Sequence, residues 1–167
     1  MSTLRIRSAK PADLPAVEAI ENRCFSASRR SSLRALKHSL HSPVQSVWVA
    51  VGRIDGQRQI AGVMILYHHR LSVRIFSLAV LPAFRGSGVG RRLVQRAVAL
   101  SRKTGRTSVT LEADRRNKVL TAWYEQFGFE TYRILKDYYS PGRHAVRMRL
   151  ILPKGRSRGC SQLDHSE

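Results

Sequence analysis

Apolar and polar residues follow two periods along this chain, one typical of strands and the other of helices. Residues 3–9 and 106–113 alternate apolar and polar positions, as half-buried strands do. Residues 88–105 and 117–128 instead repeat apolar residues every three or four positions, which gives an amphipathic helix one apolar face. The pattern therefore predicts a domain that mixes strands and helices.

The remaining segments extend this pattern into a complete order of elements. Helices are expected at residues 10–25, 31–40, 88–105 and 117–128. Strands are expected at residues 3–9, 46–52, 58–69, 72–82, 106–113, 129–139 and 144–152. The order is one strand, two helices, three strands, a helix, a strand, a helix and two strands. It predicts a single α/β domain built around a mixed sheet.

Turn and capping residues mark several of these boundaries. Asp13 is placed to cap the first helix, and Pro15 falls in its first turn. The stretch Arg-Ile-Asp-Gly at 53–56 predicts a turn between two strands. Pro82 can stop a strand, and Gly105 can terminate the helix that starts at residue 88.

The charge of the chain is strongly one-sided. Its 167 residues include 30 Lys and Arg against 11 Asp and Glu, which gives a formal net charge of +19. Such a charge attracts polyanions, such as nucleic acid, ribosomes, acidic peptides or a polyphosphate cofactor. Because the arginines are scattered rather than gathered in one block, a solvated basic surface is an equally good interpretation.

Other compositional features narrow the class of protein. The longest apolar run, 61–67, is too short for a transmembrane helix, and the first ten residues lack the apolar segment of a secretory signal. We therefore expect a cytoplasmic protein. Cys24 and Cys160 lie far apart without paired spacing, so neither a disulfide framework nor a metal site is expected.

A glycine-rich stretch, residues 82–98, carries the clearest chemical signal. Gly86, Gly88 and Gly90 lie between a predicted strand and a predicted helix, where exposed backbone N–H groups and the helix dipole favour a phosphate. Gly-Arg-Arg stands where a P-loop requires Gly-Lys-Ser/Thr, and the glycine spacing does not match a dinucleotide fingerprint. A tight turn that merely needs glycine is the alternative.

The run from Arg85 to Gly90 resembles the Arg/Gln-x-x-Gly-x-Gly/Ala signature of the GNAT N-acetyltransferases, and residues 77–84 resemble that family's fourth strand. The resemblance implies a single GNAT-type domain over residues 1–152. It would have a mixed, mostly antiparallel central sheet flanked by helices, with splayed strands forming the CoA cleft. The composition of residues 153–167 independently predicts a flexible, basic and polar tail.

In that family this element binds acetyl-CoA, so the resemblance implies a set of cofactor-binding residues. Backbone groups of the fourth strand would face the acetyl and pantetheine groups, and the turn would cradle the pyrophosphate. The residues concerned are Leu78, Ala79, Val80, Arg85, Gly86, Ser87, Gly88, Val89, Gly90 and Arg91, together with Asn117 from a second stretch described next.

That second stretch, residues 111–130, resembles the RimI-like enzymes, which acetylate the N-terminal amine of a ribosomal protein. The resemblance implies that Glu112 is the general base, that Tyr124 is the general acid and that Asn117 contacts CoA. The chemistry is consistent, because a peptide α-amine has a pKa of about 8 and a carboxylate, directly or through water, can take its proton. A tyrosine hydroxyl can supply a proton to the leaving thiolate.

Each of these assignments has a structural alternative. Tyr124 also lies on the apolar face of its helix and could be a core residue. Asn117 could cap that helix, with or without a role in binding. Glu112 could be a surface strand residue, or a partner for the nearby Arg115 or Arg116.

The last part of the domain resembles the final hairpin of N-terminal acetyltransferases, where a tyrosine pair lies beside the incoming peptide. Tyr138 and Tyr139 fit that role. Relatives commonly carry Glu-Asp where this chain has Arg143-His144, so an acidic or neutral N-terminus is expected as the acceptor.

The same resemblance implies that the basic helix 31–40 forms one wall of the acceptor cleft. The helix carries Arg34 and Lys37, and Arg29 and Arg30 precede it. The positive charge of this segment would steer anionic substrates.

The sequence thus predicts an acetyltransferase that moves an acetyl group from acetyl-CoA directly to a primary amine, with a protein N-terminus favoured. A lysine side chain or a small amine metabolite is the alternative acceptor. A basic module that binds CoA or RNA without catalysis is the alternative class. A monomer or a dimer would fit equally well.

Overall fold

The structure of this protein, a computed structural model, describes residues 3–154. Cys160 and nearly all of the predicted tail lie outside the described residues. The strands are β1 (Arg5–Ser8), β2 (Gln45–Ile54), β3 (Gln57–His68), β4 (Ser72–Val80), β5 (Ser108–Asp114), β6 (Glu130–Ser140) and β7 (Arg143–Ile151). The helices are α1 (Leu14–Cys24), α2 (Leu33–His41), α3 (Val89–Lys103) and α4 (Lys118–Glu125), with short 3-10 helices η1 (Pro11–Asp13) and η2 (Pro82–Phe84). Apart from η1 and η2, the order is the predicted one.

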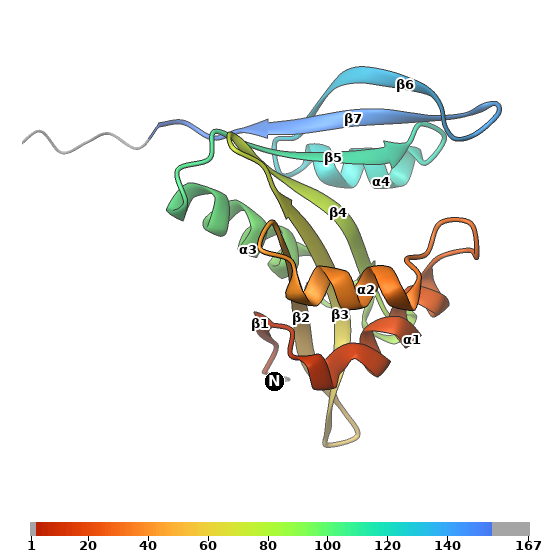
Figure 1. The fold of residues 1–167 in the computed structure, drawn as a ribbon, viewed down its shortest axis with the longest axis vertical. Coiled ribbons are helices and arrows are strands. Elements are labelled where there is room, and N and C mark those ends of the chain that lie inside the picture. The colour runs from red at the N-terminus through yellow and green to blue at the C-terminus, as the bar shows by residue number, and fades with distance from the viewer. Residues whose placement is uncertain (1–2, 155–167) are drawn as a thin grey trace, which may run out of the picture.

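All seven strands form one sheet in the order β1-β2-β3-β4-β5-β7-β6. Neighbouring strands run antiparallel except for β4 and β5, which run parallel. Figure 1 shows that the sheet twists strongly, so that β5, β6 and β7 lie across the end of the part made by β2, β3 and β4. The predicted mixed, mostly antiparallel sheet is confirmed.

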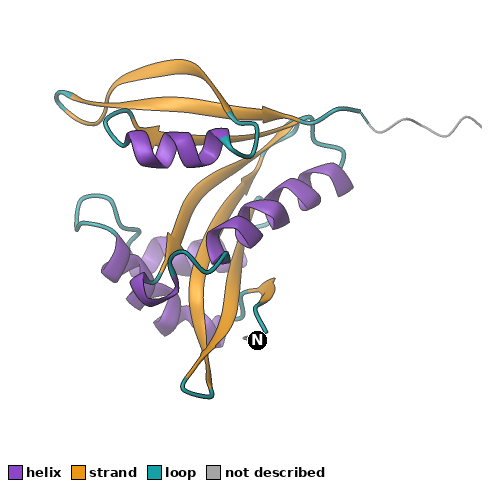
Figure 2. Ribbon diagram, turned by 180° about the vertical axis from the view of Figure 1, so that it is seen from behind, coloured by secondary structure: helices purple, strands orange, loops and turns teal. Residues whose placement is uncertain are grey.

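Helices cover both faces of the sheet. Helices α1 and α2 lie on one face of the first strands, and α3 lies on the opposite face, where α4 covers β5 and β7 (Figures 1 and 2). Strand β3 is buried on both faces: Val63 and Ile65 belong to the core under α1 and α2, and Met64 and Leu66 to the core under α3. Burial on both faces explains the continuous apolar run in the sequence.

Strands β4 and β5 pair only at their beginnings. Ser72–Ile75 is paired with 108–111, and beyond these residues the two strands separate. Within β4 the register against β3 shifts at Phe76, which is an extra residue on that strand. A bulge of this kind bends a strand and increases its twist. The rest of β4 is consequently free of a partner on the side of β5.

Some predicted boundaries move for local reasons. The first helix is divided at Asp13, whose carboxylate pairs with Arg7 at 2.6 Å instead of capping α1. The turn of the β2–β3 hairpin is reduced to Asp55 and Gly56, both with positive φ, as the tightest hairpins require.

Candidate functional site

A first cleft of about 490 Å³ opens where β4 separates from β5. It lies between the end of β4, the turn that follows, the first turn of α3, and α4. Phe25, Phe84, Leu120 and Trp123 supply much of its apolar lining. The cleft is therefore an apolar slot that ends at a helix N-terminus.

The glycine-rich turn shapes that end of the cleft. Gly86 and Gly88 have φ of 80° and 87°, a region that other residues adopt only with strain. Gly88 is the N-cap of α3, so the first backbone N–H groups of the helix have no acceptor within it. A side chain at Gly90 would meet the Trp123 ring at 3.2 Å. Glycine at these positions keeps both the turn and its N–H groups accessible.

Most residues predicted to bind the cofactor line this cleft, namely Leu78, Ala79, Val80, Arg85, Gly86, Gly88, Val89, Gly90 and Arg91. Ser87 does not line it, since its hydroxyl donates to the Phe84 carbonyl oxygen. The guanidinium of Arg85 donates from Nε to the Val80 carbonyl oxygen at 3.0 Å, and that of Arg91 lies 5.3 Å from the Phe127 ring centre.

A second cleft, of about 530 Å³, adjoins the first. It lies between α1, the loop after it, the middle of β4, the end of β5, α4 and the end of β6. Cys24, Phe25, Leu78 and Leu120 line both clefts. The two clefts therefore meet beside Leu78, at the point where β4 leaves β5.

Glu112 lines the second cleft, and arginines hold both of its carboxylate oxygens. Arg74 donates from Nε to Oε2 at 2.8 Å, and Arg147, its cross-strand neighbour on β7, donates from Nε to Oε1 at 2.9 Å. The Glu112 side chain is only 6% exposed. The predicted alternative, in which Glu112 pairs with Arg115 or Arg116, is wrong. The sheet register places Arg147 opposite Glu112, so arginines of the neighbouring strands are its partners.

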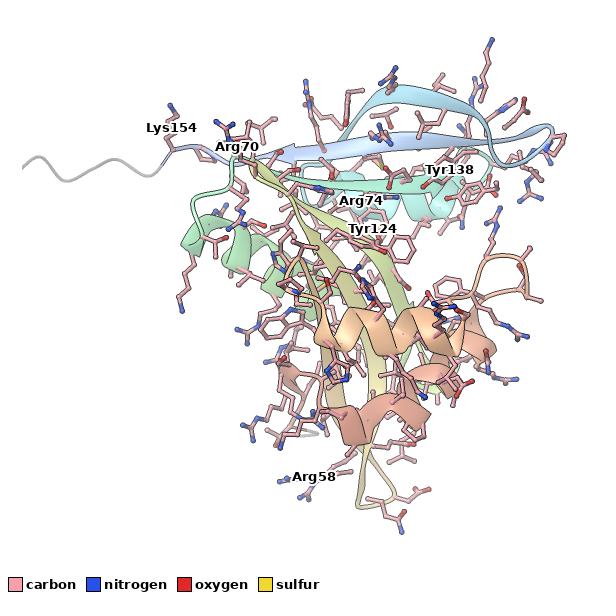
Figure 3. All side chains as sticks on the ribbon, viewed as in Figure 1. Arg58, Arg70, Arg74, Tyr124, Tyr138 and Lys154 are labelled. Carbon is pink, nitrogen blue, oxygen red and sulfur yellow. The ribbon has the colours of Figure 1, made fainter. Side chains whose placement is uncertain are left out.

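Tyr124 projects from α4 toward the same cleft. Figure 3 shows Arg74, Tyr124 and Tyr138 near one another where the two parts of the sheet meet. Tyr124 is 5% exposed and packs against Trp123 and Phe129, yet its side chain also lines the cleft. Burial raises the pKa of its hydroxyl far above the usual value. Tyr124 is thus both a core residue and a protonated group at the cleft.

Asn117 serves as the N-cap of α4, and its side chain accepts a hydrogen bond from the Leu120 N–H at 3.0 Å. It lines the second cleft, not the first. The capping interpretation is confirmed, and its contact with a cofactor stays a prediction.

Tyr138 and Tyr139 form the far wall of the second cleft, with their ring centres 5.0 Å apart. The Tyr138 hydroxyl accepts a hydrogen bond from Arg74 at 2.9 Å, and the Arg29 guanidinium lies 3.9 Å from the Tyr139 ring centre. Burial raises the pKa of Tyr139 to about 12. Both tyrosines are therefore fixed in place by arginines.

Asp114 joins three segments of the molecule. It accepts hydrogen bonds from Arg29 in the loop after α1, at 2.8 Å, and from Arg143 at the start of β7, at 2.5 Å. These partners hold the pKa of Asp114 well below its usual value. The positive charge of Arg143 is thus compensated. His144 faces the hairpin, where its Nδ1 accepts from the Asp137 N–H.

The wall of the second cleft is the loop after α1, with Ser28, Arg29 and Ser31, and not helix α2. Arg34 and Lys37 are exposed and line no part of it. The expectation that the basic helix forms this wall is wrong, because only its N-terminal loop reaches the opening between β4 and β5.

Sequence reasoning did not single out Glu21, a buried carboxylate of α1 that lines the second cleft. Its signal was a charged residue four positions after Val17 and next to Ile20, on the apolar face of a predicted helix. Arg74, Arg147 and Asp114 were also missed, because their roles depend on strand register.

Among residues 3–154 no group of three or more His, Cys, Asp or Glu side chains is arranged to hold a metal ion. Within the same part of the chain, no helix combines the length and apolar character needed to cross a bilayer.

The chain is similar to proteins of known class. Residues 14–129 match the profile of the Acetyltransferase (GNAT) family. Over 90 residues the chain is 39% identical to the N-alpha-acetyltransferase MAK3 of Arabidopsis thaliana. The matched residues make up 53% of this chain and 47% of the relative. The match thus spans about half the length of that relative.

Solved structures show the same fold at lower identity. The ribosomal-protein-S18-alanine N-acetyltransferase of Escherichia coli superimposes with a TM-score of 0.78 at 24% identity, over 89% of this chain and 94% of the other. NAA60 of Arabidopsis thaliana in complex with acetyl-CoA superimposes with a TM-score of 0.80 at 19% identity, over 90% of this chain and 99% of the other.

Proposed function

Because the chain belongs to the acetyltransferase (GNAT) family, we propose that it transfers an acetyl group from acetyl-CoA to the α-amine of a protein or peptide N-terminus. The observation that carries this proposal is the meeting of the two clefts beside Leu78, within a site that also contains Glu112 and Tyr124. The name of the Arabidopsis relative, an N-alpha-acetyltransferase, supports an α-amine as the acceptor.

The first cleft fits acetyl-CoA, which supplies the acetyl group as a thioester. Its apolar slot suits the pantetheine chain, and the N-terminus of α3 with Gly86 and Gly88 suits the pyrophosphate. Gly90 leaves room beside Trp123 that a larger residue would fill. Arg91, at the edge of the cleft, adds positive charge for phosphate.

Glu112 and Tyr124 would handle the protons. Although two arginines hold Glu112, each carboxylate oxygen keeps a further lone pair, so it can accept a proton from the amine directly or through water. Tyr124 stays protonated and can donate to the departing thiolate. The cysteine in the cleft, Cys24, is given no role, because direct transfer needs no side-chain nucleophile.

The test is release of thiol from acetyl-CoA with a library of peptides that differ at their N-termini. Wild-type protein should turn over a subset of these peptides, and Glu112→Gln and Tyr124→Phe should both lose this activity. Peptides with a blocked N-terminus and an internal lysine separate the acceptors. Turnover of the blocked peptides alone would overturn the α-amine assignment.

A second candidate property is association with RNA, and one surface pocket supports it. Arg5, Arg53 and Arg58 line a pocket of about 220 Å³. Arg53 lies directly opposite Arg58 in the β2–β3 ladder, and all three side chains are exposed and without an acidic partner among the described residues. Like charges opposite each other are destabilising, so an anion such as a phosphate would relieve them. Figure 3 shows Arg58 near the hairpin end, distant from Tyr124 and Tyr138.

Binding of a single-stranded RNA oligonucleotide at several salt concentrations tests this property. The double variant Arg53→Ser/Arg58→Ser should bind more weakly, with a logarithmic salt slope smaller by about 1.4, while acetyl transfer to peptides is unchanged. Arg133→Ser, an exposed arginine of β6, is the matched control. An unchanged slope in the double variant would exclude this pocket as an RNA-binding site.

A cytoplasmic location and the choice between monomer and dimer stay predictions.

A further inference from the structure

Glu21 is a carboxylate that the proposed chemistry does not use. It is 1% exposed and lines the second cleft. The Ser77 hydroxyl donates to its Oε1 at 2.7 Å, and the backbone N–H of Ser31 donates to its Oε2 at 3.1 Å. No cationic side chain contacts it among residues 3–154. Burying a carboxylate without a cation is costly, and a neutral glutamine could keep both contacts by accepting from the Ser31 N–H and donating to the Ser77 hydroxyl.

The other carboxylates of the cleft are neutralised. Glu112 is held by Arg74 and Arg147, and Asp114 is held by two further arginines. Four guanidinium groups therefore face two carboxylates. An amine acceptor arrives mainly as an ammonium ion at neutral pH, since an α-amine has a pKa of about 8. Of the three carboxylates that line the cleft, only Glu21 has no arginine partner among the described residues, so its negative charge is the one left for an ammonium ion.

Glu21 also lies at the right place. Ser77, its hydrogen-bond donor, immediately precedes Leu78, which lines both clefts. Cys24, less than one helical turn further along α1, lines both clefts as well. One hydrogen bond thus connects the carboxylate to Ser77, next to the segment of β4 at which the acetyl donor and the amine acceptor would meet.

We infer that Glu21 binds the positive charge of the acceptor amine and so draws the N-terminus toward the junction of the clefts. The inference rests on the proposed function and assigns the acceptor ammonium to a group distinct from Glu112. A purely structural role, in which Glu21 ties the loop after α1 to β4, predicts a different result. Glu21→Gln distinguishes them, because Gln can accept from Ser31 and donate to Ser77, so it keeps the tie and removes only the charge.

The experiment compares two forms of a peptide that wild-type protein acetylates, one with its α-amino group and one with hydrogen in its place. Calorimetric affinities are measured in the presence of CoA, so that no turnover occurs. Wild-type protein should bind the amino form on the order of tenfold more tightly, as expected for a hydrogen bond to a charged group. Glu21→Gln should bind both forms equally.

Two variants serve as controls. Glu18→Gln, which changes a carboxylate on the same helix that lines neither cleft, should keep the preference. Ser77→Ala, which weakens the tie and keeps the charge, should keep it as well.

If Glu21→Gln still bound the amino form more tightly, the inference would be overturned. Loss of that preference in Ser77→Ala would also overturn it. Equal binding of the two peptides by wild-type protein would overturn it even if Glu21→Gln did not fold. Failure of every peptide to accept an acetyl group would instead overturn the proposed function.

Discussion

At the scale of single residues, Tyr124 combines deep burial with a hydroxyl at the cleft. Its ring packs against Trp123 of α4 and Phe129, the residue before β6, and its hydroxyl makes no hydrogen bond to any residue that the structure describes. Because burial raises its pKa, the group carries its proton at neutral pH. The hydroxyl is therefore free to donate to a ligand.

Tyr124→Phe separates this role from packing. The variant keeps the ring, so its free energy of unfolding should change by less than about 1 kcal/mol. Its kcat should fall roughly 100-fold or more, as for loss of a general acid, with the KM for acetyl-CoA unchanged. Steady-state kinetics and thermal melting measure both. A kcat close to wild type in a folded variant would leave Tyr124 as a core residue only.

At the scale of elements, the first turns of α3 and α4 border the site. Both helices begin with residues that the local backbone requires, Gly88 with positive φ and Asn117 with its capping side chain. The same residues line the two clefts. Substitutions at these positions therefore have to be separated into effects on the helix and effects on binding.

For α4, Asn117→Ala should cost about 1 kcal/mol of stability through loss of the cap. Asn117→Asp should restore most of it, because the carboxylate accepts from the same N–H and suits a helix N-terminus. If Asn117 only caps, the Asp variant also has a wild-type KM for acetyl-CoA. A raised KM in a fully stable Asp variant would show contact with the cofactor.

For α3, Gly88→Ala and Gly105→Ala form a matched pair. Both glycines have positive φ, 87° and 73°, with open space around the position of a new Cβ. Each substitution should cost on the order of 1 kcal/mol. Only Gly88→Ala should weaken binding of CoA in calorimetry, because only Gly88 lines the cleft. Equal affinities in the two variants would count against phosphate binding at this turn.

At the scale of the whole molecule, Asp114 connects parts of the chain that are distant in sequence. It links β5 to Arg29, in the loop after α1, and to Arg143, in the hairpin of β6 and β7. These segments enclose the second cleft on two sides. One buried carboxylate thus ties the two sides of that cleft together.

Stability should consequently depend on pH through this group. The pKa of Asp114 is lowered in the folded state, so its stabilisation is complete above about pH 4, the pKa of an unfolded aspartate, and is lost as the pH falls further. Asp114→Asn should be less stable than wild type at pH 7 and lose less on acidification. Urea unfolding between pH 7 and pH 3 measures this. Asp55→Asn, in the exposed hairpin turn, should follow the wild-type curve.

The sequence by itself determined the order of the elements, the faces they bury and the glycine-rich turn. These features depend on local periodicity and backbone conformation. The alternation in 106–113 predicted β5, and the spacing in 88–105 predicted α3. The apolar run 61–67 lies within a predicted strand, and the structure shows that both faces of this strand are buried. Resemblance to a family through Arg85–Gly90 and 111–130 then indicated acetyl transfer.

Only the tertiary structure decided which charges meet. Glu112 contacts Arg74 and Arg147 instead of the arginines next to it in sequence, because strand register and not chain distance sets its neighbours. Glu21 belongs to the cleft because the loop after α1 and β4 converge on it. Such contacts form between segments tens of residues apart, and no local pattern in the sequence encodes which segments these are.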